Sequence, residues 1–263
     1  AGISTIDALA SSVGPVEGMP DRILADLRGQ AAMQVAQDAR PALPDGRPDV
    51  RAAVVSPVAL EALAVPDPGD VFFDFEGDPL WTSPGSTDWG LEYLFGVVEA
   101  PTEPGAEPVF RAFWAHDRAQ EKQALLDFFA YLRDRRAQFP GMHVYHYAPY
   151  EKTALGRLVG RHGVGEEQLD ALLRHGVLVD LYATVRQSVR VSQPSYSLKK
   201  LEPLYMGDQL RDAELDNAAD SIAQYALACA ARDEGRGDEA AATLQLIEGY
   251  NRYDCVSTRR LRD

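Results

Sequence analysis

The run at 71–77 constrains the fold of this chain more than any other feature. Residues 71–75 are β-branched or aromatic at every position but one, which favours a buried strand. Asp74 and Glu76 are two residues apart, so on a strand their carboxylates point to the same face. Adjacent carboxylates on a buried strand repel each other and lose hydration, and a divalent cation would remove both costs. Gly77 leaves space for a substrate backbone to approach. The alternative is that Asp74 and Glu76 only end the strand and begin a turn.

The order of the remaining elements predicts an α/β fold. Further strands are expected at 92–98, 109–114, 142–147 and 177–181. Helices are expected at 120–138, at 150–162, directly after 181, and from 218 to the end with a break near 235–237. The first three strands follow one another closely and should pair antiparallel, whereas helical crossovers make the later strands parallel. The predicted result is a mixed five-stranded sheet flanked by helices.

Composition divides the chain into three expected segments. Residues 1–40 predict a small helical segment, with one helix from Thr5 to Ala10 and a longer helix that begins at Asp21. Six prolines lie within 41–69 and prevent long helices and central strands, so we expect a linker there. The sheet and its helices should fill 70–263, with a surface loop at 101–108.

Cysteine content and hydropathy limit the cellular location that we expect for the chain. Cys229 and Cys255 have no metal-type spacing and are too few for a disulfide framework. A zinc ribbon is therefore excluded within this sequence, and a reducing cytoplasm is the expected location. No apolar run approaches the roughly 20 residues that cross a bilayer, so no membrane partner is expected.

The formal net charge of −14 argues against nucleic-acid binding, because phosphate contacts need lysine and arginine. Carboxylates that hold cations would account for part of this charge, and the bound cations would reverse its sign locally. Lys199 and Lys200 are candidate substrate contacts, although such a pair more often belongs to a solvated face. The overall charge therefore does not exclude a metal-dependent nuclease.

Five further residues carry groups suited to the same chemistry. Tyr250 and Asp254 share one face of the last helix at a spacing of i and i+4, although packing and solvation also explain such a pair. Glu151 falls in the first turn of a helix, where the helix dipole alone favours an anion. Asp180 ends a strand and is either a second-tier site residue or a helix N-cap. His146 is either a second-tier site residue or an interior histidine.

Taken in order, the first and last motifs resemble those of the DEDD 3′–5′ exonuclease superfamily, whose members have a ribonuclease-H-like fold. Asp74 and Glu76 match its first motif. Tyr250 and Asp254 match its last motif, in which the tyrosine marks the tyrosine subclass. The resemblance implies that the predicted sheet is a ribonuclease-H-like one.

The middle motif departs from the pattern of that superfamily. The pattern usually has asparagine, followed a few residues later by an aromatic residue and aspartate. Here His146 stands near the asparagine position, Tyr150 at the aromatic position and Glu151 at the aspartate position. Residues 196–201 look like the Ser-Leu-Lys segment that often precedes the last helices in these enzymes.

More narrowly, residues 74–79 and 147–152 resemble a family of predicted RecB-like nucleases. In that family a ribonuclease-H-like domain lies between a nuclease segment and a helicase. The start at Gly2 and Ile3 resembles the helix-hairpin-helix piece that precedes the domain. The resemblance implies a fragment of a longer protein with covalently linked nuclease and helicase segments, and a role in DNA repair.

The resemblance to DEDD exonucleases also implies a mechanism. Phosphodiester bonds of single-stranded DNA or RNA would be hydrolysed with two Mg²⁺ or Mn²⁺ ions about 4 Å apart. The ions would be held by Asp74, Glu76, Glu151 and Asp254, and Tyr250 would orient the attacking water. Two other hypotheses remain: a catalytically weak nucleic-acid-binding module of a larger nuclease/helicase protein, and an interaction domain with no nucleic-acid role.

Overall fold

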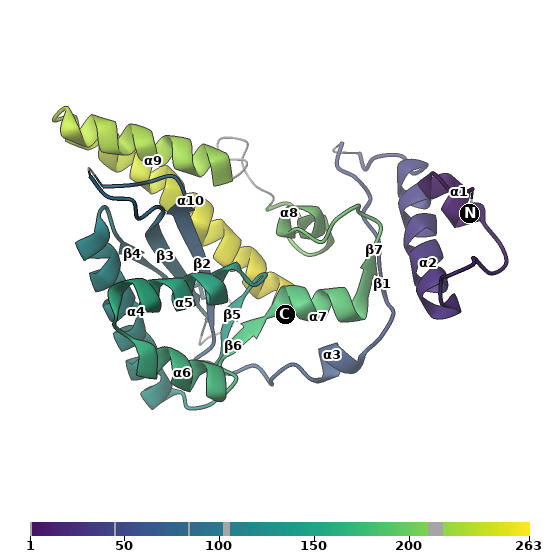
Figure 1. Cartoon of the computed structure of the whole chain (residues 1–263), viewed down its shortest axis with the longest axis horizontal. Helices are drawn as coiled ribbons and strands as arrows, with labels where there is room; N and C mark the ends of the chain where they lie inside the picture. Colours follow the sequence, from purple (N-terminus) through teal and green to yellow (C-terminus); the bar gives the residue numbers. More distant parts are fainter. Residues whose placement is uncertain (1, 45, 84, 102–105, 210–217) are drawn as a thin grey trace. The chain divides into compact units, whose positions relative to one another are not determined.

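A computed structural model describes residues 2–44, 46–83, 85–101, 106–209 and 218–263 (Figure 1). By their packing, these residues form two compact units. The sheet unit comprises Ala64–Leu181 and Arg211–Asp263, and the N-terminal unit comprises Ala1–Leu63 and Tyr182–Leu210. The division expected from composition, at 40 and at 69, stays a prediction, and packing groups 182–210 with the N-terminal residues instead of with the rest of 70–263.

Five strands form the sheet in the order β4-β3-β2-β5-β6. They are β2 (Val71–Asp78), β3 (Leu91–Glu99), β4 (Phe110–Trp114), β5 (Val144–His146) and β6 (Leu178–Asp180). Pairing is antiparallel between β2 and β3 and between β3 and β4, and parallel between β2 and β5 and between β5 and β6. This confirms the predicted mixed five-stranded sheet and puts β2, which carries Asp74 and Glu76, at its centre.

Helices cover both faces of the sheet (Figure 1). On one side lie α4 (Arg118–Gln138), α5 (Tyr150–His162) and α6 (Glu166–Arg174), and on the other α9 (Ala218–Asp233) and α10 (Gly237–Arg262). Phe73 stacks on Phe128 of α4, with ring centroids 4.6 Å apart. Because side chains alternate along a strand, Asp74 and Glu76 point to the opposite face, which α9 and α10 cover.

A β-bulge shifts the register where β2 approaches its end. Glu76 pairs with Leu94 and Gly77 pairs with Glu92, so the register skips Tyr93. Tyr93 and Leu94 consequently both pack on the side of α9 and α10, where Tyr93 stacks on Tyr225 at a centroid distance of 3.9 Å. The bulge turns the hydroxyl of Tyr93 toward the same face as Glu76.

An ion pair anchors the last turn of α10 to the start of β2. The Nη1 atom of Arg262 lies 2.7 Å from Oδ2 of Asp70, which is fully buried. The guanidinium also lies over the rings of Phe72 and Tyr145, 5.0 and 5.1 Å from their centroids. This contact fixes α10 along β2 and thereby helps to place Asp254, two turns earlier on the same helix.

Most of the regular elements of the N-terminal unit are helices. Its elements are α1 (Ile6–Ser11), α2 (Asp21–Asp38), β1 (Ala52–Val54), α3 (Val58–Glu61), most of α7 (Leu181–Ser188), β7 (Val189–Val191), α8 (Leu198–Leu201) and a 3₁₀ turn (Glu202–Leu204). The hydroxyl of Thr5 accepts a hydrogen bond of 3.1 Å from the backbone of Ala8 and caps α1. The two predicted helices are thus present, and β1 pairs with β7 in a two-stranded antiparallel sheet.

Several elements were not predicted. The strands β1 and β7 gave no clear signal, because three-residue strands show no alternation. Helix α6 was missed although Leu169, Leu172 and Leu173 have the helical spacing i, i+3 and i+4. Residues 102–105 of the expected surface loop lie outside the described residues. Among the residues described, no helix combines the length and the apolar character needed to cross a membrane.

Gly96 provides a test of how closely α10 packs on the sheet. A Cβ at Gly96 of β3 would overlap the side-chain oxygen of Asn251 on α10. We expect Gly96→Ala to lower the free energy of unfolding by about 1–3 kcal/mol, as overpacking does. The matched control is Gly156→Ala, since a Cβ in this mid-helix position of α5 meets no atom within 4 Å. This control should raise stability by about 0.5–1 kcal/mol. Urea denaturation measures both, and a Gly96→Ala protein as stable as wild type would contradict the packing.

Candidate metal centre

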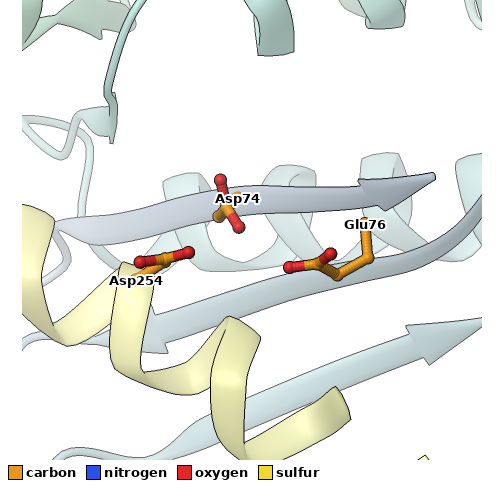
Figure 2. A group of neighbouring side chains, drawn as sticks. All are labelled: Asp74, Glu76 and Asp254. Carbon is orange, nitrogen blue, oxygen red and sulfur yellow. The ribbon is translucent and has the colours of Figure 1, made fainter. Parts of the chain in front are cut away.

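Three carboxylates meet between β2 and α10. Asp74 and Glu76 come from β2 and Asp254 comes from α10, and each offers one oxygen such that these oxygens all lie within 4.8 Å of one another. Figure 2 shows the three side chains converging. The alternation of β2 accounts for the first two, and the packing of α10 over this face of the sheet accounts for the third. We call these three residues the acidic cluster.

The electrostatics of the acidic cluster are unfavourable without a cation. Burial raises the pKa of Asp74 well above its usual range, and the charges of Asp254, Glu76 and Glu151 raise it further. Asp74 keeps part of its surface exposed, but the surrounding protein removes most of the hydration of its carboxylate. Carboxylate oxygens are the ligands that hard divalent cations prefer, so the donor set fits a hard divalent cation.

Asn251 orients Asp74. It is fully buried on α10, and its amide nitrogen donates a hydrogen bond of 2.9 Å to Oδ2 of Asp74. Gly96, which pairs with Asp74 across the sheet, leaves the space that the amide fills. Sequence analysis missed Asn251. The available signal was its place on the buried stripe of α10 between Ile247 and Cys255, where a polar residue needs a partner.

A second chain of hydrogen bonds holds Glu76. The hydroxyl of Ser221 on α9 donates to Oε2 of Glu76 at 2.8 Å. The hydroxyls of Ser221 and Tyr93 lie 2.7 Å apart, and both residues are fully buried. Burial and the charge of Glu76 raise the pKa of Tyr93, which keeps its hydroxyl protonated. Sequence analysis also missed this pair, because the bulge that turns Tyr93 has no sequence signal here.

Glu151 lies at the start of α5, next to the acidic cluster. Its side chain is nearly fully buried, and its charge is one of those that raise the pKa of Asp74. Burial raises the pKa of Glu151, and the neighbouring His146 opposes this shift. The Oε2 atom lies 3.3 Å from Nδ1 of His146 but has no hydrogen-bond partner in the described part of the chain.

The turn before α5 explains how Glu151 is placed. Ala148 has a φ of +76°, a left-handed conformation that residues other than glycine rarely adopt. Nδ1 of His146 donates to the carbonyl of Ala148 at 2.8 Å, and Oδ1 of Asp180 accepts from its backbone nitrogen at 2.9 Å. His146 and Asp180, expected as second-tier residues, therefore support the turn that leads to Glu151.

The remaining predicted residues take different places. Tyr250 lies one turn before Asp254 on α10. Gly77 lies on β2, where a Cβ would overlap the carboxylate of Glu92 unless that side chain shifted, so internal packing also favours glycine. Lys199 and Lys200 lie on α8, in the N-terminal unit, whereas the acidic cluster belongs to the sheet unit.

Glu121 and Glu92, two other buried carboxylates of the sheet unit, are paired with arginines. Glu121 is fully buried and lies 3.1 Å from Arg118, 3.3 Å from Arg161 and 2.7 Å from His162. Glu92 is paired with Arg157 and accepts a hydrogen bond from Tyr150. The main influences on the pKa of Asp74 are instead burial and three carboxylates, which marks the acidic cluster as the place where a cation would fit.

Comparison with known proteins agrees with this geometry. A family model described as the RNase H superfamily matches residues 71–263, a range that holds the whole acidic cluster. No curated protein and no solved structure matched the chain. The match suggests a nuclease, and nucleases of this superfamily generally use divalent metal ions.

The raised pKa of Asp74 predicts how pH affects stability in metal-free buffer. A carboxyl group whose pKa is higher in the folded than in the unfolded chain stabilises the fold below its unfolded pKa, about 3.9, and this contribution is lost as pH rises through the folded pKa. Each unit of the shift costs about 1.4 kcal/mol at pH values above both.

We therefore expect Asp74→Asn to be more stable than wild type at pH 8 in the presence of EDTA, with the difference closing toward pH 4. Urea denaturation at the two pH values measures it. Asp170→Asn is the control, since Asp170 is an exposed α6 residue paired with Arg174, and it should change stability by less than about 0.5 kcal/mol. An Asp74→Asn protein that is less stable than wild type at pH 8 would contradict the electrostatic description.

Proposed function

We propose that the chain, which belongs to the RNase H superfamily, is a metal-dependent nuclease that hydrolyses phosphodiester bonds of single-stranded DNA or RNA. One observation carries the proposal. Oxygens of Asp74, Glu76 and Asp254 lie within 4.8 Å of one another. Burial and the charges of the neighbouring carboxylates raise the pKa of Asp74. A protein gains nothing in stability from such an arrangement, whereas a divalent cation would turn the repulsion into attraction.

The residues of the site would have different roles in metal binding. Asp74, Glu76 and Asp254 would hold Mg²⁺ or Mn²⁺, and Oε2 of Glu151, which accepts no hydrogen bond from the described residues, offers a ligand for a second ion. When bound, two such ions supply the positive charge that favours the attacking hydroxide and the departing 3′ oxygen. Asn251 holds one oxygen of Asp74 by a hydrogen bond and so fixes its orientation.

Tyr250 is proposed to orient the attacking water. Tyr250 lies one turn before Asp254 on α10, a spacing at which two side chains share one face of a helix. The matching motifs of the tyrosine subclass of DEDD exonucleases support this role and a 3′–5′ polarity. The motifs shared with RecB-like nucleases support a place for this chain beside linked nuclease and helicase segments.

The first test is cleavage of 5′-labelled single-stranded DNA and RNA with Mg²⁺ or Mn²⁺. Asp254→Asn removes one ligand and should slow cleavage at least about 100-fold, because a metal supplies several kcal/mol of charge stabilisation. The control Asp170→Asn should cleave like wild type. A shortening ladder indicates 3′–5′ exonuclease action, and internal fragments indicate endonuclease action.

Calorimetric titration with Mn²⁺ separates the remaining outcomes. Wild type that neither binds Mn²⁺ nor cleaves would contradict the proposal. Wild type that binds Mn²⁺ and single strands without cleaving them would favour a binding module of a larger protein. The glutamate at 151, where the resembling enzymes have aspartate, is the feature that favours this second function.

Tyr250→Phe tests the proposed role of the phenol. If the hydroxyl positions the water, the variant should lower kcat about 100-fold, while the Kd for Mn²⁺ stays unchanged. Tyr131→Phe is the control, because that hydroxyl bonds to Glu99 on another part of the sheet unit. Equal kcat values for Tyr250→Phe and wild type would remove Tyr250 from the mechanism.

A further inference from the structure

Tyr93 and Ser221 form a chain of two buried hydroxyls that ends on the carboxylate of Glu76. Ser221 lies in the first turn of α9, and its hydroxyl donates to Oε2 of Glu76 at 2.8 Å. The hydroxyls of Tyr93 and Ser221 lie 2.7 Å apart, and both residues are fully buried. A serine hydroxyl has one proton, and that of Ser221 is donated to Glu76. Tyr93 must therefore donate to Ser221, so both hydrogen bonds point toward the acidic cluster.

The β-bulge between β2 and β3 brings the Tyr93 hydroxyl to this place. In an unbroken ladder Tyr93 would pair with Gly77, and it would point to the face of the sheet opposite to Glu76. A register shift between Glu76 and Gly77 instead leaves Tyr93 without a paired residue on β2. Bulges are frequent beside active sites, where they redirect a side chain. The one irregularity of this ladder thus coincides with the residue whose hydroxyl leads to Glu76.

Packing accounts for the Tyr93 ring but not for its hydroxyl. The ring stacks on that of Tyr225 of α9, with centroids 3.9 Å apart, and lies nearly parallel to the ring of Trp114 at 6.4 Å. Phenylalanine at 93 would keep this stacking, and with alanine at 221 no buried hydroxyl would need a partner. Replacing both members of a buried hydrogen-bonded pair by apolar groups of similar shape is nearly neutral for stability. The two hydroxyls are therefore better explained by the carboxylate on which they end.

The chain would prepare Glu76 for a cation. A free glutamate side chain has several rotamers, and holding it in one of them costs conformational entropy. The Ser221 hydroxyl fixes one oxygen of Glu76, and Tyr93 in turn fixes that hydroxyl. Residues that hold a metal ligand in this way typically contribute about 10- to 100-fold to metal affinity. Because both donors are neutral, the negative charge of Glu76 is kept.

We propose that Ser221 and Tyr93 are positioning residues for the metal ligand Glu76, and that Tyr93 acts only through Ser221. The inference rests on the proposed function, since it takes the acidic cluster as a site for a divalent cation. It extends the site from β2 and α10 to α9 and to the bulged part of β3. Metal affinity then depends on two residues that do not themselves bind the ion.

Calorimetric titration of the protein with Mn²⁺ tests the inference. Ser221→Ala should raise the Kd about 10- to 100-fold. Tyr93→Phe should raise it about 2- to 10-fold, the effect of one net hydrogen bond. The double variant should bind like Ser221→Ala alone, because the Tyr93 hydroxyl has no route to Glu76 once the serine hydroxyl is removed. Ser221→Thr keeps a hydroxyl and should bind more tightly than Ser221→Ala.

Tyr225→Phe is the matched control. The Tyr225 hydroxyl donates to the carbonyl of Ala115 at 3.3 Å and lies 3.1 Å from Nδ1 of His116. The control therefore loses a hydroxyl from a buried ring that stacks on Tyr93, but it leaves the chain to Glu76 intact. Its Kd for Mn²⁺ should equal that of wild type.

Urea denaturation establishes which variants are folded. If Ser221→Ala is not, the comparison of Tyr93→Phe with Tyr225→Phe decides, since both variants keep their rings. Equal Kd values for these two variants would overturn the inference. A folded Ser221→Ala protein that binds like wild type would also overturn it. So would a double variant whose loss multiplies the two single losses, or a folded Ser221→Thr protein that binds no better than Ser221→Ala.

The same titration separates this inference from the proposed function. In each of the outcomes above wild type still binds Mn²⁺, so only the positioning roles of Ser221 and Tyr93 would be lost. Wild type that binds no Mn²⁺ would instead overturn both the metal site and its positioning residues.

Discussion

The repulsion among carboxylates on the central strand is the constraint on which the rest of the structure depends. Asp74 and Glu76 share the face of β2 that α10 covers, and α10 brings a third carboxylate, Asp254, to the same place. A fold can hold such groups together only if the helix is fixed by other contacts. Arg262 fixes it through its ion pair with Asp70, and the missing side chain at Gly96 lets the helix approach closely.

The buried carboxylates of the sheet unit have two kinds of partner, charged and neutral. Glu92 and Glu121 are paired with arginines of α4 and α5, so that loss of an arginine would leave a buried charge without compensation. Asp74 and Glu76 instead receive hydrogen bonds from the neutral side chains of Asn251 and Ser221. Neutral donors orient a carboxylate without cancelling its charge. The cluster is therefore ordered before a cation arrives, and its charge remains available for binding one.

Prediction from the sequence was most accurate where a residue's neighbours along the chain determine its environment. The aromatic run of β2 predicted a buried strand, and the spacings of Asp74 with Glu76 and of Tyr250 with Asp254 placed each pair on one face. Prediction from the sequence missed features that tertiary packing determines. The register shift opposite Tyr93, the amide of Asn251 beside Gly96 and the grouping of 182–210 with the N-terminal residues depend on contacts between distant segments.

Direct observation of the metal would test the central claim, that the acidic cluster exists to hold divalent cations. Crystals of the protein soaked in Mn²⁺ should show anomalous-difference density between β2 and α10, with oxygens of Asp74, Glu76 and Asp254 among the ligands. A second peak beside Glu151 would extend the site to two ions. The account would be contradicted by crystals that bind Mn²⁺ elsewhere on the chain and leave the space between these three carboxylates without density.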